Sequence, residues 1–127
     1  MRAPAGNRTP RHRAERRGRF AERLCRWHLR LRGWQIVAAG WRCPSGEIDI
    51  VARRRGVLAI VEVKSRRDLD TAVASILPRQ RRRIARATAA FLSAHPDLAA
   101  MTLRFDVMLV APMRPPRHLA NAWRADE

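Results

Sequence analysis

The spacing of apolar side chains along the chain predicts a helix, three strands, a second helix and a fourth strand. Over residues 14–32, apolar side chains recur at intervals of three and four, which is typical of an amphipathic helix. Gly33 suits the position that ends such a helix. The side chains expected to face the core are Phe20, Leu24, Trp27 and Leu31.

Short runs of β-branched and apolar residues predict the strands. The first run covers residues 34–41. The next two, 48–52 and 57–63, are separated by a polar connection that contains Gly56, as in a β-hairpin. Residues 102–110 predict the last strand, in which Arg104 and Asp106 share a face. We expect these two to form a structural ion pair, the alternative being that Asp106 supports a nearby site.

The second helix is predicted over residues 78–94, because Pro78 suits a first helical position. A short apolar link, 71–77, precedes it. Its expected buried face consists of Ile84, Ala87, Phe91 and Ala94. The order of elements predicts an α/β domain with a mixed, mostly antiparallel sheet of four or five strands flanked by helices.

The chain is expected to form one domain over residues 14–112. Residues 1–13 are rich in Pro, Gly and Arg with almost no large apolar side chains, which predicts a disordered basic arm. Residues 113–127 are expected to pack an aromatic side chain onto the domain and to fray at the end.

A formal net charge of +16 favours a polyanionic partner. Nucleic acid is the first candidate and an acidic membrane surface the second. No apolar run is long enough to span a bilayer, and no secretion signal is recognised, so we expect a cytoplasmic protein. Cys25 and Cys43 lack C-x-x-C spacing and are interpreted as core or near-core residues, not as a disulfide or zinc site.

Charged side chains interrupt the predicted hairpin at matching places. Alternation along a strand puts Glu47 and Asp49 on one face with Val51, and Glu62 shares a face with Lys64. If the two faces coincide, Asp49, Glu62 and Lys64 converge on one spot. Such a cluster is costly unless something binds there, and a divalent metal with a phosphate fits it. The alternative is an ordinary cross-strand salt bridge.

Lys64 is the only lysine among 27 basic residues, the other 26 being arginine. Arginine stays protonated and offers a planar fork, whereas lysine is a compact ammonium that gives up its proton when buried. A site that needs a point charge beside a reacting water, or a group able to take a proton, would use lysine.

These segments resemble a known family. The stretches 46–51 (GEIDIV) and 61–64 (VEVK) resemble the D…E-x-K core of the PD-(D/E)XK nuclease superfamily. More specifically, residues 18–123 resemble the YraN family of small bacterial proteins. The resemblance includes Gly18 with Glu22, Trp41 with Arg42, and the stretch 104–107 (RFDV). It implies a restriction-endonuclease-like fold similar to that of archaeal Holliday-junction resolvases.

The resemblance implies metal-dependent hydrolysis of phosphodiester bonds in DNA, including branched DNA. Asp49, Glu62 and the carbonyl of Val63 would hold Mg²⁺ or Mn²⁺, and Lys64 would orient the attacking water or neutralise developing charge. Glu22 matches an acidic residue that reaches the metal in the resolvases; otherwise it pairs with a neighbouring arginine. Glu47 would help to hold the metal or cap a strand end. The analogy also implies a homodimer.

Arginines near the predicted site are candidates for backbone contacts with nucleic acid. Arg66 and Arg67 follow the VEVK strand, and four more crowd the first half of the second helix, namely Arg79, Arg81, Arg82 and Arg83. Positive charges at a helix N-terminus oppose the macrodipole, and a bound phosphate would offset this. Solvated surface arginines are the plainer interpretation.

Two other function classes also fit the sequence. One is a non-catalytic nucleic-acid-binding protein that keeps the nuclease-like fold. The other is a basic protein associated with RNA. DNA is favoured over RNA because no aromatic RNA-stacking motif occurs in the sequence.

Overall fold

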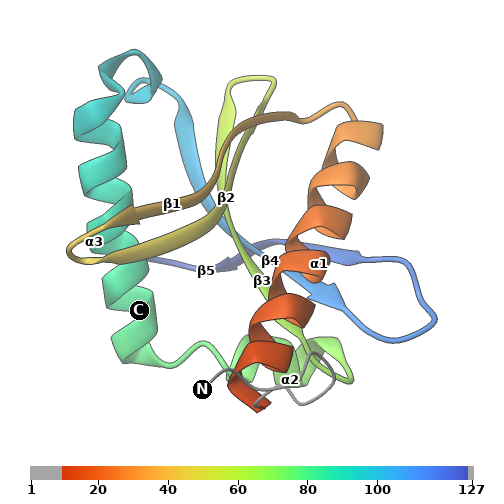
Figure 1. Ribbon diagram of the computed structural model, residues 1–127. Helices are drawn as coiled ribbons and strands as arrows, with labels where there is room; N and C mark the ends of the chain where they lie inside the picture. Colours follow the sequence, from red (N-terminus) through yellow and green to blue (C-terminus); the bar gives the residue numbers. More distant parts are fainter. Residues whose placement is uncertain (1–9, 126–127) are drawn as a thin grey trace, which may run out of the picture.

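The computed structural model describes the backbone of residues 10–125 and the side chains of residues 18–125. Five strands form one sheet with helices on both faces (Figure 1). In chain order the elements are α1 (Pro10–Leu31), β1 (Gln35–Cys43), β2 (Gly46–Arg54), β3 (Val57–Ser65), α2 (Leu69–Ala74), α3 (Pro78–Ala94), a 3₁₀ turn η1 (Pro96–Leu98), β4 (Thr102–Val110) and β5 (Arg117–Trp123).

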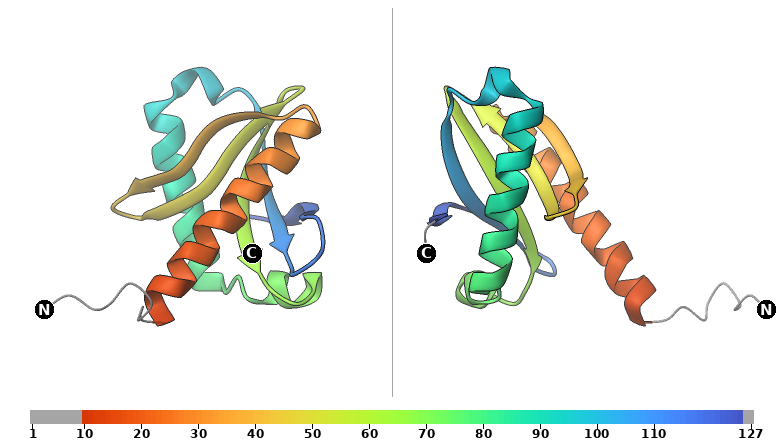
Figure 2. Two further views of the ribbon diagram at one scale, coloured as in Figure 1. Left: turned by 45° about the vertical axis from the view of Figure 1, so that its right-hand side comes forward. Right: turned by 90° about the vertical axis from the view of Figure 1, so that its left-hand side faces the viewer.

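The strands lie in the order β1-β2-β3-β4-β5. Only β3 and β4 pair in parallel, and all other neighbours are antiparallel, which confirms the predicted mixed α/β fold. The crossover that a parallel pair requires is supplied by α2 and α3. In the two views of Figure 2, α1 and α3 lie on opposite sides of the sheet.

Two apolar clusters hold the layers together, one on each face. On one face Ile84, Ala87 and Phe91 of α3 pack against the sheet, whereas Ala94 of the predicted buried set is exposed. On the other face Cys25 and Leu29 of α1 do so. β3 is buried on both faces from residue 58 to residue 61, which explains why its sequence is continuously apolar and not alternating.

The predicted buried stripe of α1 is wrong. Phe20, Trp27 and Leu31 are 57%, 58% and 79% exposed, and the buried face is instead Ala21, Cys25 and Leu29. Both sets have helical spacing, so periodicity alone does not distinguish them. Two of these three buried side chains, Ala21 and Cys25, are small, which lets the helix backbone approach the sheet closely.

Several element boundaries differ from the sequence-based prediction. α1 begins at Pro10, so the predicted arm 1–13 overlaps its first turn, and residues 1–9 of that arm lie outside the described part of the chain. The link before α3 contains a helix, α2, capped by the side chain of Asp68. The C-terminal segment supplies a fifth strand, whose Trp123 stacks on Phe105. No helix within residues 10–125 is long and apolar enough to cross a bilayer.

Asp106 is completely buried, and both oxygens of its carboxylate have hydrogen-bond partners. Arg104 donates to it through Nε and Nη2 at 2.9 and 2.8 Å, which confirms the predicted ion pair. The Asn121 N–H donates at 2.9 Å, and His118 Nε2 lies at 2.7 Å. Burial alone would raise the pKa of Asp106, but the bonds from His118, Arg104 and Asn121 outweigh it and lower the pKa. These contacts tie β5 to β4.

Replacing Asp106 with Asn should therefore destabilise the domain by about 3 kcal/mol, because the Arg104 guanidinium would lose the charge that compensates it. Urea denaturation followed by circular dichroism measures this change. Asp97→Asn, at an exposed position on η1, is the matched control and should stay within about 0.5 kcal/mol of the wild type. Equal stability of both variants would contradict the role given to the buried pair.

Candidate functional site

The candidate site lies where β2 and β3 separate. The two strands pair from Ile50 opposite Val61 to Arg54 opposite Val57. Beyond that pairing, residues 46–48 of β2 pair with β1 alone, and residues 62–65 of β3 pair with β4 alone. Asp49 and Glu62 are the first residues past the point of separation. We call this opening the fork.

The predicted alternation along β2 fails at Asp49. Ile48 belongs to the same apolar cluster as Val51, whereas Ile50 and Ala52 belong to the cluster on the other face. Strict alternation would put Ile48 with Ile50. Because β2 has left β3 at this point, the ladder no longer fixes the strand's orientation, and the chain can turn at Asp49.

Asp49 spans the fork. Its Oδ2 accepts a hydrogen bond from the backbone N–H of Val63 at 2.9 Å, in place of a ladder bond that β2 no longer supplies. The carbonyl and N–H of one strand residue point to the same edge, so the Val63 carbonyl also faces the fork. One carboxylate and one carbonyl oxygen are thus brought together at the strand edge.

Glu62 is the buried acid of the site. Its Oε1 accepts a hydrogen bond from Gln80 Nε2 at 3.1 Å and lies 3.6 Å from Lys64 Nζ. The predicted meeting of Glu62 with Lys64 is therefore present. Gln80, in the first turn of α3, was not predicted as a site residue. Its position four residues before the buried Ile84 was a usable signal, because residues i and i+4 share a helix face.

The carboxyl groups of Asp49 and Glu62 lie close enough to shift each other's pKa. Burial, followed by the charge of Asp49, raises the pKa of Glu62 to about 8. Burial likewise raises the pKa of Asp49, although its bond from Val63 opposes the change. Two carboxyl groups this close cannot both ionise without a compensating cation.

Glu22 reaches the same site from the inner side of α1. Burial, then the charges of Asp49 and Glu47, raises its pKa to about 7, and the arginines of its own helix, Arg26 and Arg19, oppose this more weakly. Glu22 lines a cavity of about 270 Å³ together with Gly18, Ala21, Val63, Lys64, Ser65 and Arg66. Of the two interpretations of Glu22, the geometry therefore favours the one that faces the site.

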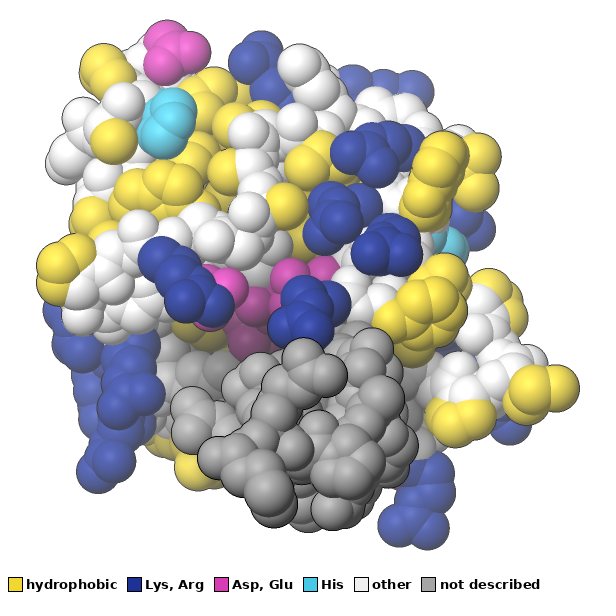
Figure 3. Space-filling view, in the orientation of Figure 1, with side chains coloured by type: hydrophobic (Ala, Val, Ile, Leu, Met, Phe, Trp, Pro, Cys, Tyr) yellow, Lys and Arg dark blue, Asp and Glu magenta, His cyan; other side chains and the backbone are white. Residues whose placement is uncertain are grey.

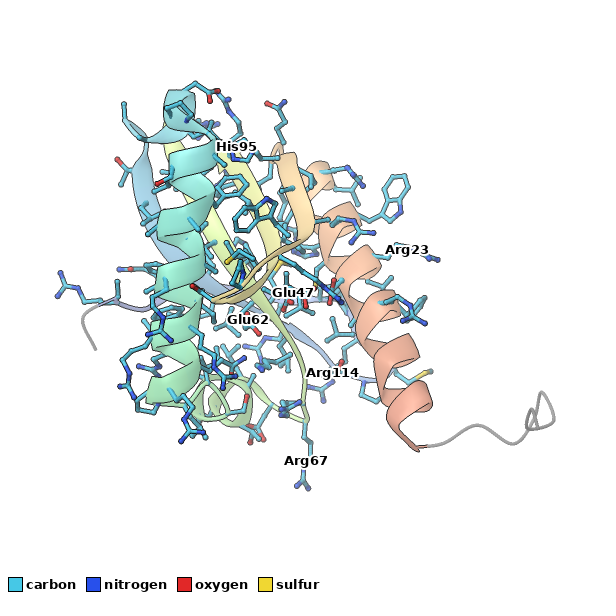
Figure 4. The ribbon with its side chains drawn as sticks, turned by 60° about the vertical axis from the view of Figure 1, so that its left-hand side comes forward. Arg23, Glu47, Glu62, Arg67, His95 and Arg114 are labelled. Atoms are coloured by element: carbon cyan, nitrogen blue, oxygen red, sulfur yellow. The ribbon has the colours of Figure 1, made fainter. Side chains whose placement is uncertain are left out.

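Glu47 lies at the rim of the fork. Its carboxylate is 3.5 Å from Arg42 Nε across the β1–β2 pair, and its side chain is partly exposed. It is close enough to Asp49 and Glu22 to raise the pKa of both. In Figure 4, Glu47 and Glu62 lie near each other between α3 and α1.

Arginines surround this acidic centre. Figure 3 shows acidic side chains in a hollow at the middle of one face, with dark-blue basic side chains around them. Arg66 lines the cavity, and Arg67 points outward from the loop after β3 (Figure 4). On α3, Arg79, Arg82 and Arg83 are exposed. Arg81 differs, because its Nε donates to the Ile76 carbonyl at 3.0 Å and its guanidinium lies over Trp123.

The donors in the fork suit one class of metal. They are oxygens from carboxylates and a carbonyl, which magnesium and manganese prefer. Among the described residues, no three His, Cys, Asp or Glu side chains form a ready-made metal cage. Magnesium does not require one, since it is commonly held by one or two carboxylates and keeps several waters. Asp49, Glu62 and Val63 therefore fit such an ion.

The raised pKa values predict an unusual pH dependence without divalent ions. Between the ordinary pKa of 4.5 and about 8, Glu62 ionises in the unfolded chain but stays protonated in the folded one. The free energy of unfolding should therefore fall as pH rises through this window. Glu62→Gln should flatten the slope, with a difference of at least about 1 kcal/mol between pH 5 and pH 8. Urea titrations in EDTA measure it, and parallel slopes would contradict the buried proton.

Comparison with known proteins identifies relatives of this chain. Residues 21–110 match the model of "Uncharacterised protein family UPF0102". A UPF0102 protein of Parvibaculum lavamentivorans is 49% identical over 122 residues, 96% of this chain and 92% of the relative. One of Paramagnetospirillum magneticum is 57% identical over 82 residues, which cover 65% of this chain and 64% of that protein. The resemblance to the YraN family is thereby confirmed, and the chain belongs to the UPF0102 family.

Proposed function

We propose that this protein is a metal-dependent nuclease of the PD-(D/E)XK type that hydrolyses phosphodiester bonds in DNA. The observation that carries the proposal is the fork itself. Asp49, Glu62 and Lys64 meet there with raised carboxyl pKa values, on a face where arginines surround them. A buried acidic cluster within a protein of net charge +16 is expected where a cation and a polyanion bind together.

Asp49, Glu62 and the Val63 carbonyl would hold Mg²⁺ or Mn²⁺. When bound, such an ion lowers the pKa of a coordinated water and polarises the phosphate. Gln80 would keep the Glu62 carboxylate oriented toward the ion through its 3.1 Å hydrogen bond. Glu22 and Glu47, at the cavity wall and the rim, would bind waters of the ion's hydration shell.

Lys64 would act on the phosphate and the attacking water. Its side chain is only 14% exposed, and it lines the same cavity as Glu22. A fixed ammonium in a partly dehydrated site stabilises the negative charge that grows on the phosphate oxygens as the new P–O bond forms. The ammonium also orients the water for attack in line with the leaving oxygen.

The surrounding arginines would bind the DNA backbone. Arg66 lines the cavity and Arg67 points outward from the loop after β3. Both would bind phosphates next to the bond that is cut. Arg79, Arg82 and Arg83 project from the first half of α3, and the β1–β2 turn packs against Arg83 at Gly46. This arrangement offers a positively charged rim on one side of the fork. Branched DNA remains an expectation from the resemblance to resolvases.

Asp49→Asn and Lys64→Ala should each lower the rate of cutting at least about 100-fold, because each removes a charge that acts on the transition state. Duplex, single-stranded and branched DNA are incubated with Mg²⁺ or Mn²⁺, and products are resolved on denaturing gels. Asp70→Asn and Arg53→Ala, at exposed positions, are the matched controls and should cut at the wild-type rate.

The outcome separates an enzyme from a binding protein. Cutting that persists in both site variants would indicate a contaminating nuclease. Binding of DNA without any cutting, in wild type and variants alike, would reject the enzyme and favour a non-catalytic binding protein.

The salt dependence of DNA binding tests the arginine rim separately. Replacing Arg82 and Arg83 with Ala together should reduce the slope of log K against log salt by up to about 1.8, since each lost phosphate contact removes about 0.9 on duplex DNA. Arg55→Ala, at the exposed β2–β3 turn and so at the far end of this hairpin from the fork, is the control. An unchanged slope in the double variant would show that α3 does not contact the DNA backbone.

A further inference from the structure

The outer side of α1 carries an apolar surface with nothing packed on it. Three of its large side chains, Phe20, Trp27 and Leu31, are more than half exposed, and Leu24 lies between them in the same row. Only six large apolar residues are exposed among the described side chains. Besides these three, Met113 also lies on this side of the molecule, where it lines a cavity together with Phe20 and Leu24. We call the row Phe20, Leu24, Trp27 and Leu31 the outer row.

The outer row continues into a groove. A cavity of about 520 Å³ lies between α1 and the loop after β4, and most of its lining is apolar. Phe20 and Leu24 form one wall, and Val110, Pro112 and the fully exposed Met113 form the other. In Figure 3, hydrophobic side chains gather on the right of the molecule, over α1 and this loop, with arginines between them.

The charges that border this surface are positive. Arg19, Arg23 and Arg30 are exposed on α1, and Arg114 stands at the end of the groove. Arg30 lies over the ring of Trp27, 5.9 Å from its centroid. Figure 4 shows Arg23 on the side of α1 that faces away from the sheet. Of the described residues that line the groove, none is acidic.

The spacing of the outer row is that of a helix-pairing seam. Intervals of four, three and four residues are the a/d pattern with which one helix packs against another. Arg23 and Arg30 then occupy g positions, which face the flanking residues of a partner helix. We propose that the outer row and its groove bind an amphipathic helix of another protein, with apolar residues on one face and Asp or Glu beside them.

Other occupants fit the surface less well. A second copy of this chain would set arginines against arginines along the seam, and like charges there disfavour pairing. Nucleic acid would contact the arginines through its phosphates, but it would leave the apolar side chains of the outer row exposed to water. A flat lipid surface would leave the groove unfilled, whereas side chains of a docked helix fill it.

The docking surface adjoins the cavity at the fork but does not include its acids. Ala21 and Ser65 line both the groove and the site cavity. A partner bound to the outer row would therefore sit beside the mouth of the candidate active site. The docking proposal does not depend on nuclease activity, and its test uses binding alone.

The test uses a labelled synthetic peptide with leucines at three- and four-residue spacing and glutamates on both sides. Fluorescence anisotropy should show saturable binding to the wild-type protein, and a peptide of the same composition in scrambled order should bind at least tenfold more weakly. Trp27→Glu and Arg23→Glu should each weaken binding at least tenfold. Both positions are exposed, so neither change disturbs the core.

Matched substitutions elsewhere control for charge and for loss of an apolar side chain. Leu77, just before α3, is a leucine that is 62% exposed, and Arg86 is an exposed arginine on α3. The variants Leu77→Glu and Arg86→Glu should both bind the peptide like the wild type. Equal binding of the scrambled peptide, or equal loss in the controls, would overturn the proposal. So would a wild-type dimer in sedimentation that Trp27→Glu dissociates, which would assign the surface to a second copy. Binding of anionic vesicles that Trp27→Glu abolishes would overturn it in favour of lipid.

Discussion

The hydrogen bond between the Val63 N–H and the Asp49 carboxylate is the contact on which the candidate site depends. It lies just past the end of the β2–β3 ladder, where two paired strands would otherwise drift apart. By bonding a side chain of β2 to the backbone of β3, it joins the two strands across the fork. The opening exposes a carbonyl edge, brings Asp49 against Glu62, and leaves room for the cavity bordered by α1.

The exposed arginines and the buried acids of the fork lie close together but have very different electrostatic environments. A net charge of +16 would lower the pKa of a carboxyl group if distance and water did not intervene. The arginines are mostly exposed, and their charges are screened over roughly 10 Å in dilute salt. The acids of the fork are buried instead, and burial raises the pKa of Asp49 and Glu62 despite the surrounding charge. Local dehydration therefore outweighs the global field at this point.

Sequence patterns predicted the β2–β3 hairpin and the contact between Glu62 and Lys64, because both depend on residues close together in the sequence. The β3 run and its E-x-K end fall on one strand, so the Glu62–Lys64 contact followed from alternation alone. Three features did not follow. The inner face of α1 includes small residues such as Cys25, whose burial depends on how closely the helix approaches the sheet. The turn at Asp49 depends on where pairing ends, and the bond from Gln80 depends on tertiary packing of α3.

Lys64 has a further consequence, which concerns covalent labelling. It is the only side-chain amine in the chain, and it lies in the cavity beside Glu22. Amine-selective acylating reagents therefore have a single side-chain amine as their target, and arginines elsewhere do not compete for it. In a lysine-rich nucleic-acid-binding protein the same chemistry would be spread over the whole surface. Here the degree of modification reports on the occupancy of one cavity.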